Sequence, residues 1–453
     1  MDFEPPLLLP LLRRLPPARR YLVAFSGGCD STVLLHALRV LHVELSVPLL
    51  ALHVDHGLQT PSARWAEHCA RQCAHWQVPC ECRRVDARAN PGESREAAAR
   101  RARYAALAAA MRPGDILLTA HHQDDQAETF LLQLLRGAGP RGLAAMPACV
   151  SFGEGYLARP LLDFSRRQLC DYAQRRGLAW IDDPSNFDTA FDRNFLRNTV
   201  LPPLVARWPA AMQVIARASA HQGEAAQLLD ELAAADLGRL QSGDALDITE
   251  LHALSQVRAR NLLRYWIRTL GLPVPDAGRA QRILDEVVGA REDATPRVSW
   301  RGAEARRYRD RLFVLPPLPP VPAAGFSWDG RTALMVPGLG VLEAAEAPGG
   351  LDPAWRGARL QVRFGVAGEQ CRPVGRAHHQ SLKKLWQEAG VPPWERERTP
   401  LVYVDGVLAA VGERWICAEF AAPAQEMGWM PLWRPFAIET TSQKDDNLPG
   451  PAP

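Results

Sequence analysis

Apolar residues in the first two hundred positions fall in short runs that alternate with helical stretches. Strand-like runs lie at 21–25, 49–54, 78–85 and 115–120, and helical stretches at 32–45, 62–76, 94–111 and 124–136. Such an alternation predicts parallel strands with helices on both faces, and these sheets bind ligands at the carboxyl ends of their strands. We therefore expect an α/β fold, a doubly wound parallel sheet of Rossmann-like type, with polar side chains gathered after each strand.

The pattern changes after about residue 208. Stretches at 212–235, 257–270 and 281–288 predict a helical domain, and the proline-rich run 316–322 predicts a semi-rigid linker. Short strand-like runs with Gly and Pro turns then predict a small α+β C-terminal domain and a polar tail. The expected parts are a catalytic domain, a helical domain, a linker region, a C-terminal domain and a disordered tail, at 1–208, 209–315, 316–352, 353–437 and 438–453.

Composition narrows the class of protein. The formal net charge is only +3 over 453 residues, so any surface that binds nucleic acid has to be local. No apolar run is long enough to span a bilayer, which predicts a soluble protein. The nine cysteines are an odd number and include no C-x-x-C pair, which favours reduced thiols over disulfides or structural zinc. Reduced thiols indicate the cytoplasm.

A glycine-containing loop follows the first strand. Its residues are Ser26, Gly27, Gly28, Cys29, Asp30 and Ser31, directly before a helical stretch. Unpaired N–H groups at a helix start favour an anion, and a divalent cation would let Asp30 lie beside a phosphate. Lysine occurs only at positions 383, 384 and 444, so a Walker loop is absent. The loop instead resembles the S-G-G-x-D-S loop of enzymes that split ATP into AMP and pyrophosphate.

Two further strands end in polar residues. His53, Asp55 and His56 follow the second strand, where we expect nucleotide contact at the same sheet edge. Asp124, Asp125 and Glu128 follow the fourth strand, with the two aspartates in the first helical turn, where carboxylates cap N–H groups. Glu128 shares a helix face with both aspartates, and these like charges repel unless a cation lies between them. A zinc site with the preceding histidines is a weaker alternative, because no H-x-x-x-H pair is present.

Arginines form the remaining polar groups. Glu96 and Arg100 make a favourable i,i+4 pair, and Arg100 shares a helix face with Arg103, from which either could reach a phosphate or a carboxylate. Arg193 and Arg197 belong to a set of arginines beside Gly, Pro or Asn that indicates a phosphate-facing rim.

The stretch 375–398 is the candidate nucleic-acid surface. A helix there turns apolar residues to one side and Lys383 and Lys384 outward. An exposed aromatic and basic side chains in the same stretch favour RNA binding. The residues expected to contact RNA are Arg376, Lys383, Lys384, Trp394, Arg396 and Arg398, with Arg193 and Arg197 in the first domain.

These motifs together resemble the long form of the tRNA(Ile)-lysidine synthetases, over nearly the whole chain. The matching segments, in order, are S-G-G-x-D-S at 26–31, H-V-D-H-G at 53–57, E-A-A-A-R-R-A-R-Y at 96–104, H-x-D-D-x-x-E at 122–128, R-G-x-G at 136–139, R-P-L-L at 159–162, D-x-S-N at 183–186 and R-N-F-L-R at 193–197. The resemblance implies adenylation by ATP of the carbonyl oxygen at carbon 2 of the wobble cytidine in the CAU anticodon of tRNA(Ile). The ε-amino group of free lysine then displaces AMP and forms lysidine.

The resemblance also suggests roles for the residues. Mg²⁺ near Asp30 and the loop N–H groups would hold the phosphates of ATP as the leaving group. Asp124, Asp125, Glu128 and Glu96 would bind the lysine substrate, with Asp125, Glu128, Asp30 and Arg100 as catalytic residues. The sequence leaves open which carboxylate is the base, and the oligomeric state, a dimer included.

Two other functions are open to such a chain. One is another ATP pyrophosphatase that modifies tRNA, such as a thiolase, although Cys69, Cys73, Cys80 and Cys82 lack the spacing of an iron–sulfur site. The other is a non-catalytic RNA-binding protein that keeps the nucleotide fold. The intact Asp30 and acidic cluster count against the second.

Overall fold

The structure is a computed structural model that describes residues 2–55, 62–89, 94–291 and 294–436. The chain forms two compact units, which divide within a long helix between residues 232 and 233. Each unit is described by itself. In the described part of the chain, every helix is too short or too polar to cross a membrane.

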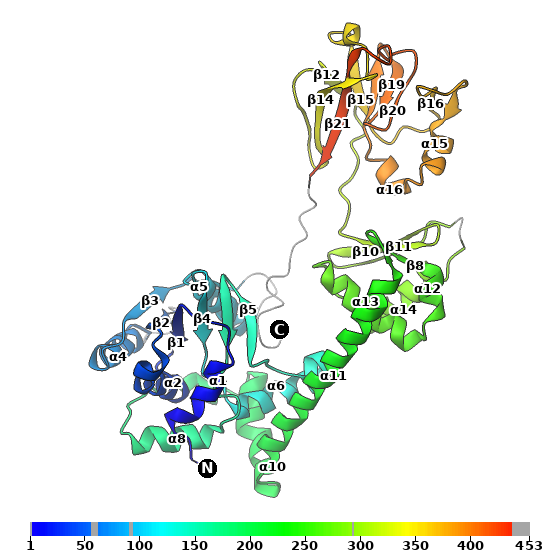
Figure 1. The fold of residues 1–453 in the computed structure, drawn as a ribbon. Helices are drawn as coiled ribbons and strands as arrows, with labels where there is room; N and C mark the ends of the chain where they lie inside the picture. Colours follow the sequence, from blue (N-terminus) through cyan, green and yellow to red (C-terminus); the bar gives the residue numbers. More distant parts are fainter. Residues whose placement is uncertain (1, 56–61, 90–93, 292–293, 437–453) are drawn as a thin grey trace. The chain divides into compact units, whose positions relative to one another are not determined.

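The first unit is built on a six-stranded sheet with the order β3-β2-β1-β4-β6-β5. β5 pairs antiparallel with β6, and the other neighbouring pairs are parallel. The strands are β1 (Arg20–Ala24), β2 (Leu49–Asp55), β3 (Cys80–Arg84), β4 (Asp115–Leu118), β5 (Cys149–Phe152) and β6 (Gly155–Ala158). The predicted doubly wound parallel sheet is confirmed, and Figure 1 shows its strands beside the helices that cover them.

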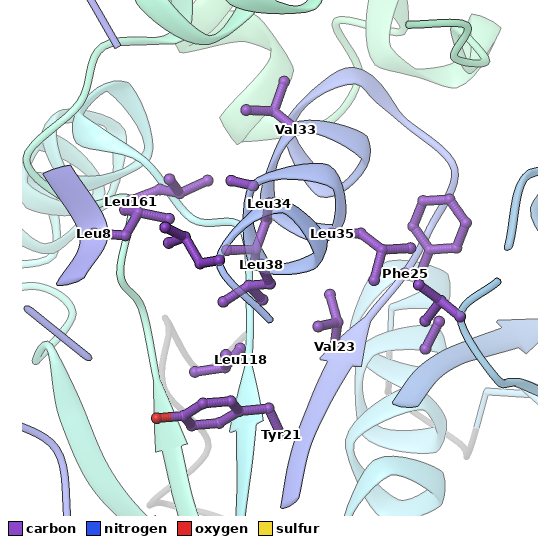
Figure 2. Close-up of a cluster of buried hydrophobic side chains, with 14 of the residues drawn as sticks. Leu8, Tyr21, Val23, Phe25, Val33, Leu34, Leu35, Leu38, Leu118 and Leu161 are labelled. Carbon is purple, nitrogen blue, oxygen red and sulfur yellow. The ribbon is translucent and has the colours of Figure 1, made fainter. Parts of the chain in front are cut away.

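Alternate residues of β1 face opposite sides of this sheet, as a strand with two buried faces requires. Tyr21 and Val23 pack into one core with helix α2 (Cys29–Val40), whereas Leu22 packs into the other core, under helix α5 (Arg95–Ala108). Figure 2 shows Val23 and Phe25 beside the leucines of α2, together with Leu118 from β4. This packing fixes α2 at the end of β1, so the loop between them is held from both sides.

The remaining helices of the first unit complete the layers and lead out of the sheet. They are α1 (Leu9–Arg13), α3 (His42–Leu45), α4 (Ser62–His75), α6 (Gln123–Leu135), α7 (Pro140–Leu143), α8 (Arg166–Arg175), α9 (Asp192–Phe195), α10 (Leu201–Arg207) and α11 (Ala211–Leu240), with the 3-10 helices η1 (Pro5–Leu8) and η2 (Pro184–Phe187) and the π-helix η3 (Leu196–Val200). The helices expected at 32–45, 62–76, 94–111 and 124–136 correspond to α2 with α3, α4, α5 and α6.

The second unit begins with helices on an antiparallel sheet. The helices expected at 212–235, 257–270 and 281–288 are present as α11, α13 (Gln256–Thr269) and the end of α14 (Ala277–Arg282) with η4 (Ile283–Val288). A further helix, α12 (Ile248–Ala253), was not expected. The sequence pattern missed a five-stranded sheet in the same region, β7-β8-β11-β10-β9, at Gln241–Ser242, Ala245–Asp247, Arg311–Leu315, Ala303–Tyr308 and Arg297–Trp300. Its strands carry charged residues inside, because buried Glu304 pairs with Arg297 and Arg306. The apolar alternation that marks a strand is therefore weak here.

The C-terminal part of the chain contains three small sheets. Their strand orders are β12-β15-β18-β19-β20, β13-β14-β21 and β16-β17. The strands are β12 (Phe326–Trp328), β13 (Leu334–Val336), β14 (Gly340–Pro348), β15 (Leu360–Arg363), β16 (Gln370–Cys371), β17 (Gln380–Ser381), β18 (Leu401–Val404), β19 (Val407–Val411), β20 (Trp415–Ile416) and β21 (Met427–Pro435), with the turn η5 (Pro353–Trp355) and helices α15 (Leu382–Glu388) and α16 (Pro393–Arg396).

Three of these strands lie in the segment that we expected to be a linker. β12, β13 and β14 fall within 316–352, yet β12 pairs with β15, and β14 pairs with β21 over nine residue positions. The first ten residues of this segment, 316–325, contain no strand, and the later strand-free residues are short connections between strands. The linker expectation is therefore corrected for 326–348. The expected tail, 438–453, lies outside the described residues.

Candidate functional site

A cavity of about 520 Å³ opens at the carboxyl edge of the parallel sheet. The last residues of β2 and the residues that follow β1 and β4 line it, together with residues of α5 and of the 181–186 segment. This is the edge at which the alternating pattern predicted a ligand site. The lining includes the expected loop residues Ser26, Gly28, Cys29, Asp30 and Ser31, and also His53 and Asp55.

The loop between β1 and α2 has a backbone that requires glycine. Gly27 has a φ of +82°, and a Cβ at this position would lie 2.8 Å from the Sγ of Cys69. Gly28 is the N-cap of α2, and no described side chain caps that end. Ser31 Oγ donates to the carbonyl oxygen of Gly28 at 3.1 Å and lies 3.0 Å from Ser26 Oγ. The start of α2 therefore presents N–H groups and hydroxyls, the donors that bind an anion.

Asp30 brings a carboxylate to the same helix start. Its Oδ1 is buried and has no hydrogen-bond partner among the described residues, and its Oδ2 lies 3.6 Å from His122 Nε2. A buried carboxylate oxygen without a donor is costly unless a ligand supplies one. A hard cation that also binds phosphate oxygens would satisfy it.

His53 and Asp55 at the end of β2 have partners within the sheet. The ring of His53 donates from Nδ1 to the carbonyl oxygen of Phe25 at 2.9 Å, since that oxygen can only accept. Asp55 Oδ2 lies 3.8 Å from Arg84 Nε. Both residues line the cavity, as expected for nucleotide contact. His56 lies outside the described residues.

His122 lies between three carboxylates at the start of α6. Its ring nitrogens are 3.4 Å from Asp125 Oδ2, 3.6 Å from Asp30 Oδ2 and 3.7 Å from Asp124 Oδ2. Burial alone would lower the pKa of this imidazole, but the three carboxylates outweigh it and raise the pKa to about 9. His121 beside it has a pKa well below its usual value because it is desolvated. The pair therefore holds one cationic and one neutral ring at pH 7.

The acidic cluster is neutralised by arginines. Glu128, only 1% exposed, accepts from Arg193 Nε at 2.7 Å and from Arg197 Nε at 2.7 Å. Asp125 Oδ1 accepts from the Nη2 atoms of both arginines at 3.2 Å. The repulsion expected between Asp125 and Glu128 is thus removed by two guanidinium groups, which the sequence reading had assigned to an RNA-facing rim. These four side chains are called the ion cluster below.

The ion cluster lies beside the cavity rather than in its wall. Of its four members only Arg197 lines the cavity. Burial raises the pKa of Asp125, but the positive charges of His122 and the two arginines outweigh burial, so that the pKa lies below its usual value. Asp124 accepts from the backbone N–H of Arg166 at 2.8 Å, at the first turn of α8. The three acids therefore have partners before any lysine arrives.

On α5, a different arginine from the expected one reaches the cavity. Arg103 and Tyr104 line it, whereas Arg100 is not part of the lining and lies over the ring of Tyr104 at 4.9 Å. Glu96 belongs to α5, but its side chain lies outside the described set. The catalytic role expected for Arg100 stays a prediction, with Arg103 as the better placed neighbour.

Other lining residues went unassigned by sequence reasoning. They include Thr119, Tyr104, Arg166, Asp183 and Asn186. Asp183 and Asn186 belong to the D-x-S-N segment, so that motif was the signal for them. Arg166 and Thr119 carried no local signal, because only the fold brings α8 and the end of β4 to the loop.

The C-terminal RNA candidates separate into exposed and buried groups. Lys383 is exposed, and Lys384 is 62% exposed and 3.9 Å from Glu388. Arg376 is 42% exposed and pairs with Glu388 at 2.8 Å. These three can meet a phosphate at the surface.

Trp394, Arg396 and Arg398 lie inside the fold instead. Trp394 is 7% exposed and packs edge-on against Phe313 at 5.2 Å, so the exposure that we expected is wrong. Arg396 donates to the carbonyl oxygen of Val391, and Arg398 donates to those of Trp394 and Pro319. Their guanidinium groups donate to backbone carbonyl oxygens, so few of their N–H groups are available to bind a phosphate.

Among the described residues, no group of three or more His, Cys, Asp or Glu side chains could hold a metal ion. The nine cysteines are free thiols in the structure.

Comparison with known proteins agrees with this arrangement. Family models match as a PP-loop domain at residues 8–204, a TilS substrate binding domain at 246–313 and a TilS substrate C-terminal domain at 360–433. Curated relatives named tRNA(Ile)-lysidine synthase are similar over nearly the whole chain. That of Methylococcus capsulatus is 46% identical, covering 93% of this chain and 98% of the relative. Those of Alkalilimnicola ehrlichii and Coxiella burnetii are 45% and 42% identical, covering 93% and 94% of this chain and 95% and 96% of the relatives. The chain therefore belongs to the tRNA(Ile)-lysidine synthase family.

Proposed function

We propose that this protein is a ligase that joins lysine to carbon 2 of the wobble cytidine of tRNA(Ile) with a CAU anticodon, and that it splits ATP into AMP and pyrophosphate. The observation that carries the proposal is the glycine loop with its uncapped helix start beside the unpartnered Oδ1 of Asp30. Full-length similarity to tRNA(Ile)-lysidine synthases supports the substrate.

The loop suits the first half of this reaction. The N–H groups at the start of α2 and the hydroxyls of Ser26 and Ser31 can bind the phosphates that leave as pyrophosphate. Mg²⁺ fits beside Asp30, because Mg²⁺ is usually bound by one or two carboxylates together with substrate phosphates. When bound, it would offset the negative charge that develops on the leaving pyrophosphate.

The second half needs a site for the lysine amine. An amine with a reference pKa of about 10.4 has to lose a proton before it attacks. The candidate acceptors remain Asp124, Asp125 and Glu128, but Asp125 and Glu128 already hold Arg193 and Arg197. We infer that an ammonium group would share these carboxylates with the arginines, and that Arg197, the one of these two arginines that lines the cavity, is nearer to the reacting groups than Arg193.

Of the C-terminal residues expected to bind tRNA, we propose that only three contact it. Lys383, Lys384 and Arg376 are exposed, whereas the other expected side chains hold the domain together. Oligomeric state and a location in the cytoplasm remain predictions.

The test is incubation of the full chain with ATP, labelled lysine and tRNA transcripts. We expect labelled lysine at the wobble position of tRNA(Ile) with a CAU anticodon, and none on a transcript whose wobble base is uridine. Pyrophosphate release without lysine transfer would favour another pyrophosphatase. Binding of tRNA without ATP cleavage would favour a non-catalytic protein. Either result would overturn the proposal.

A further inference from the structure

A second cavity, of about 660 Å³, lies in the first unit away from the residues assigned above. It is bounded by α2, by α4 with the residue that follows it, and by the turn after α8. It is called the basic pocket below. None of its lining residues belongs to the cavity at the carboxyl edge of the sheet.

Arginines reach the basic pocket from all three of its walls. Arg39 comes from α2, Arg71 from α4 and Arg176 from the end of α8, and three histidines lie among them. Among the described lining residues none carries a carboxylate. The nearest acidic partner of Arg71 is Glu67 at 3.6 Å, and both side chains are about 70% exposed, so that pair is weak. Arg176 pairs with Glu4 at 3.1 Å, a carboxylate that it shares with Arg175, and Arg39 Nε donates to the carbonyl oxygen of Trp76 at 2.9 Å. Three arginines against two partly exposed carboxylates outside the lining leave this concave site with an excess of positive charge, which attracts an anion.

The pKa of His36, which lines the pocket, is affected by this positive charge. His36 accepts or donates a hydrogen bond with the hydroxyl of Tyr172 at 2.9 Å. Burial lowers the pKa of His36, and the charges of Arg39 and Arg176 lower it further. Because fixed cations lower the pKa of a neighbouring imidazole, this shift indicates a positive electrostatic potential in the pocket, which a bound anion would reduce.

Two polar atoms beside the pocket have no partner. His68 Nε2, which can donate to an anion, and Gln72 Oε1, which can only accept, are buried and unpaired among the described residues, whereas Gln72 Nε2 donates to the carbonyl oxygen of Ala179 at 2.9 Å. Gln72 thus already joins the α4 wall to the segment after α8. An anion held by Arg71 and Arg176 would join the same two walls with charge-assisted bonds.

Both of these walls also touch the glycine loop. The carbonyl oxygen of Gly27 accepts from the N–H of Ile181 at 2.9 Å, two residues beyond Ala179 in the pocket. On the other wall, the ring of His68 lies 3.7 Å from the place a Cβ of Gly27 would take. The basic pocket and the glycine loop are therefore both in contact with α4 and with the segment that follows α8.

We propose that the basic pocket binds a phosphate group, and that Arg39, Arg71 and Arg176 hold it. The arginine fork matches phosphate geometry, and three forks from separate elements can surround one tetrahedral anion. The phosphate can come from two sources, a small free phosphate or a backbone phosphate of bound RNA. Because the pocket walls contact Gly27, occupancy favours the loop conformation that binds ATP, and the two ligands then strengthen each other's binding.

The first arm of the test titrates inorganic phosphate calorimetrically into the full chain saturated with a non-hydrolysable ATP analogue. The analogue keeps phosphate away from the glycine loop. Arg71→Glu reverses a charge on a side chain that is 71% exposed, so it leaves folding intact. We expect this variant to bind phosphate at least about tenfold more weakly, since a charge-assisted bond becomes a repulsion. Arg167→Ala is the matched control, because Arg167 is 91% exposed on α8 outside the pocket.

The second arm measures binding of a tRNA transcript against salt for the same two variants. If the phosphate belongs to RNA, Arg71→Glu lowers the slope of log affinity against log salt by about one, and Arg167→Ala does not. If the phosphate is small and free, the slope is unchanged and only the calorimetric site is lost. Equal behaviour of Arg71→Glu and Arg167→Ala in both arms overturns the proposal.

Discussion

Replacement of Glu128 by glutamine tests the ion cluster most directly. Glu128 is 1% exposed and accepts three hydrogen bonds, at 2.7 Å from each arginine Nε and at 2.9 Å from Arg197 Nη2. With Asp125, the two carboxylates balance the two guanidinium groups. Glu128→Gln keeps the shape of the side chain but leaves one positive charge uncompensated. Removing one partner of a buried pair costs about 3–5 kcal/mol.

This cost is measurable as a melting temperature. For a unit of this size each kcal/mol shifts Tm by about 2–4 °C, so a loss of about 3 kcal/mol lowers it by about 6–12 °C. Differential scanning calorimetry of the full chain reports separate transitions, and the one that ATP raises in the unchanged protein belongs to the first unit. We expect that transition to fall by this amount in Glu128→Gln.

Glu67→Gln is the matched control on α4. Glu67 is 68% exposed and lies 3.6 Å from Arg71, so its loss costs less than about 1 kcal/mol. Added salt should change the Glu128→Gln effect little, because buried charges are poorly screened. If the two variants melt within a degree or two of each other, the buried ion cluster contributes no net stability and the reasoning is refuted.

Other predictions concern the loop, the histidine and the C-terminal surface. Asp30→Asn should reduce AMP formation by at least about a hundredfold by removing the carboxylate that we propose holds Mg²⁺, measured as pyrophosphate release; near-normal release would contradict it. Gly27→Ala should weaken ATP binding, measured calorimetrically, since the φ of +82° and the nearby thiol exclude a Cβ. His122 has a raised folded pKa of about 9, so its contribution to stability is full below pH about 6.5 and is lost as pH rises to 9. Melting of the ATP-free, Mg²⁺-free protein against pH checks this, and His122→Asn should flatten the curve. Lys383→Ala with Lys384→Ala should lower the salt slope of tRNA binding by up to about two; an unchanged slope would exclude this surface.

The parallel sheet and the glycine loop could be predicted because their signals are local. Strand β1 is apolar on both faces, and Gly27 and Gly28 stand directly between it and α2. The antiparallel sheet of the second unit could not be read in the same way. Glu304 and Arg307 are buried in β10. Glu304 pairs with Arg297 of β9 as well as with Arg306 of its own strand, and Arg307 donates to the carbonyl oxygen of Val288 in η4. A periodic apolar pattern is therefore absent where the sheet has charged interior positions.

The candidate site also has residues that local sequence signals predict and residues that only the tertiary structure reveals. Asp125 and Glu128 were found from their spacing, but the spacing suggested repulsion that a substrate cation would relieve. Arg193 and Arg197, about seventy residues later, supply that charge, and only tertiary structure shows it. The exposure expected for Trp394 was wrong for a related reason. Its neighbours in sequence are polar, but its neighbours in space are the aromatic rings of Tyr308 and Phe313.

We propose that the cavity at the sheet edge is where ATP adenylates the wobble cytidine. A tRNA(Ile) transcript carrying heavy oxygen at carbon 2 of that cytidine tests it in a single turnover with ATP and lysine. Adenylation predicts that the label leaves with AMP, because the bond between carbon 2 and that oxygen breaks when the amine attacks. AMP that carries no label, formed alongside lysine-modified tRNA, would contradict the account.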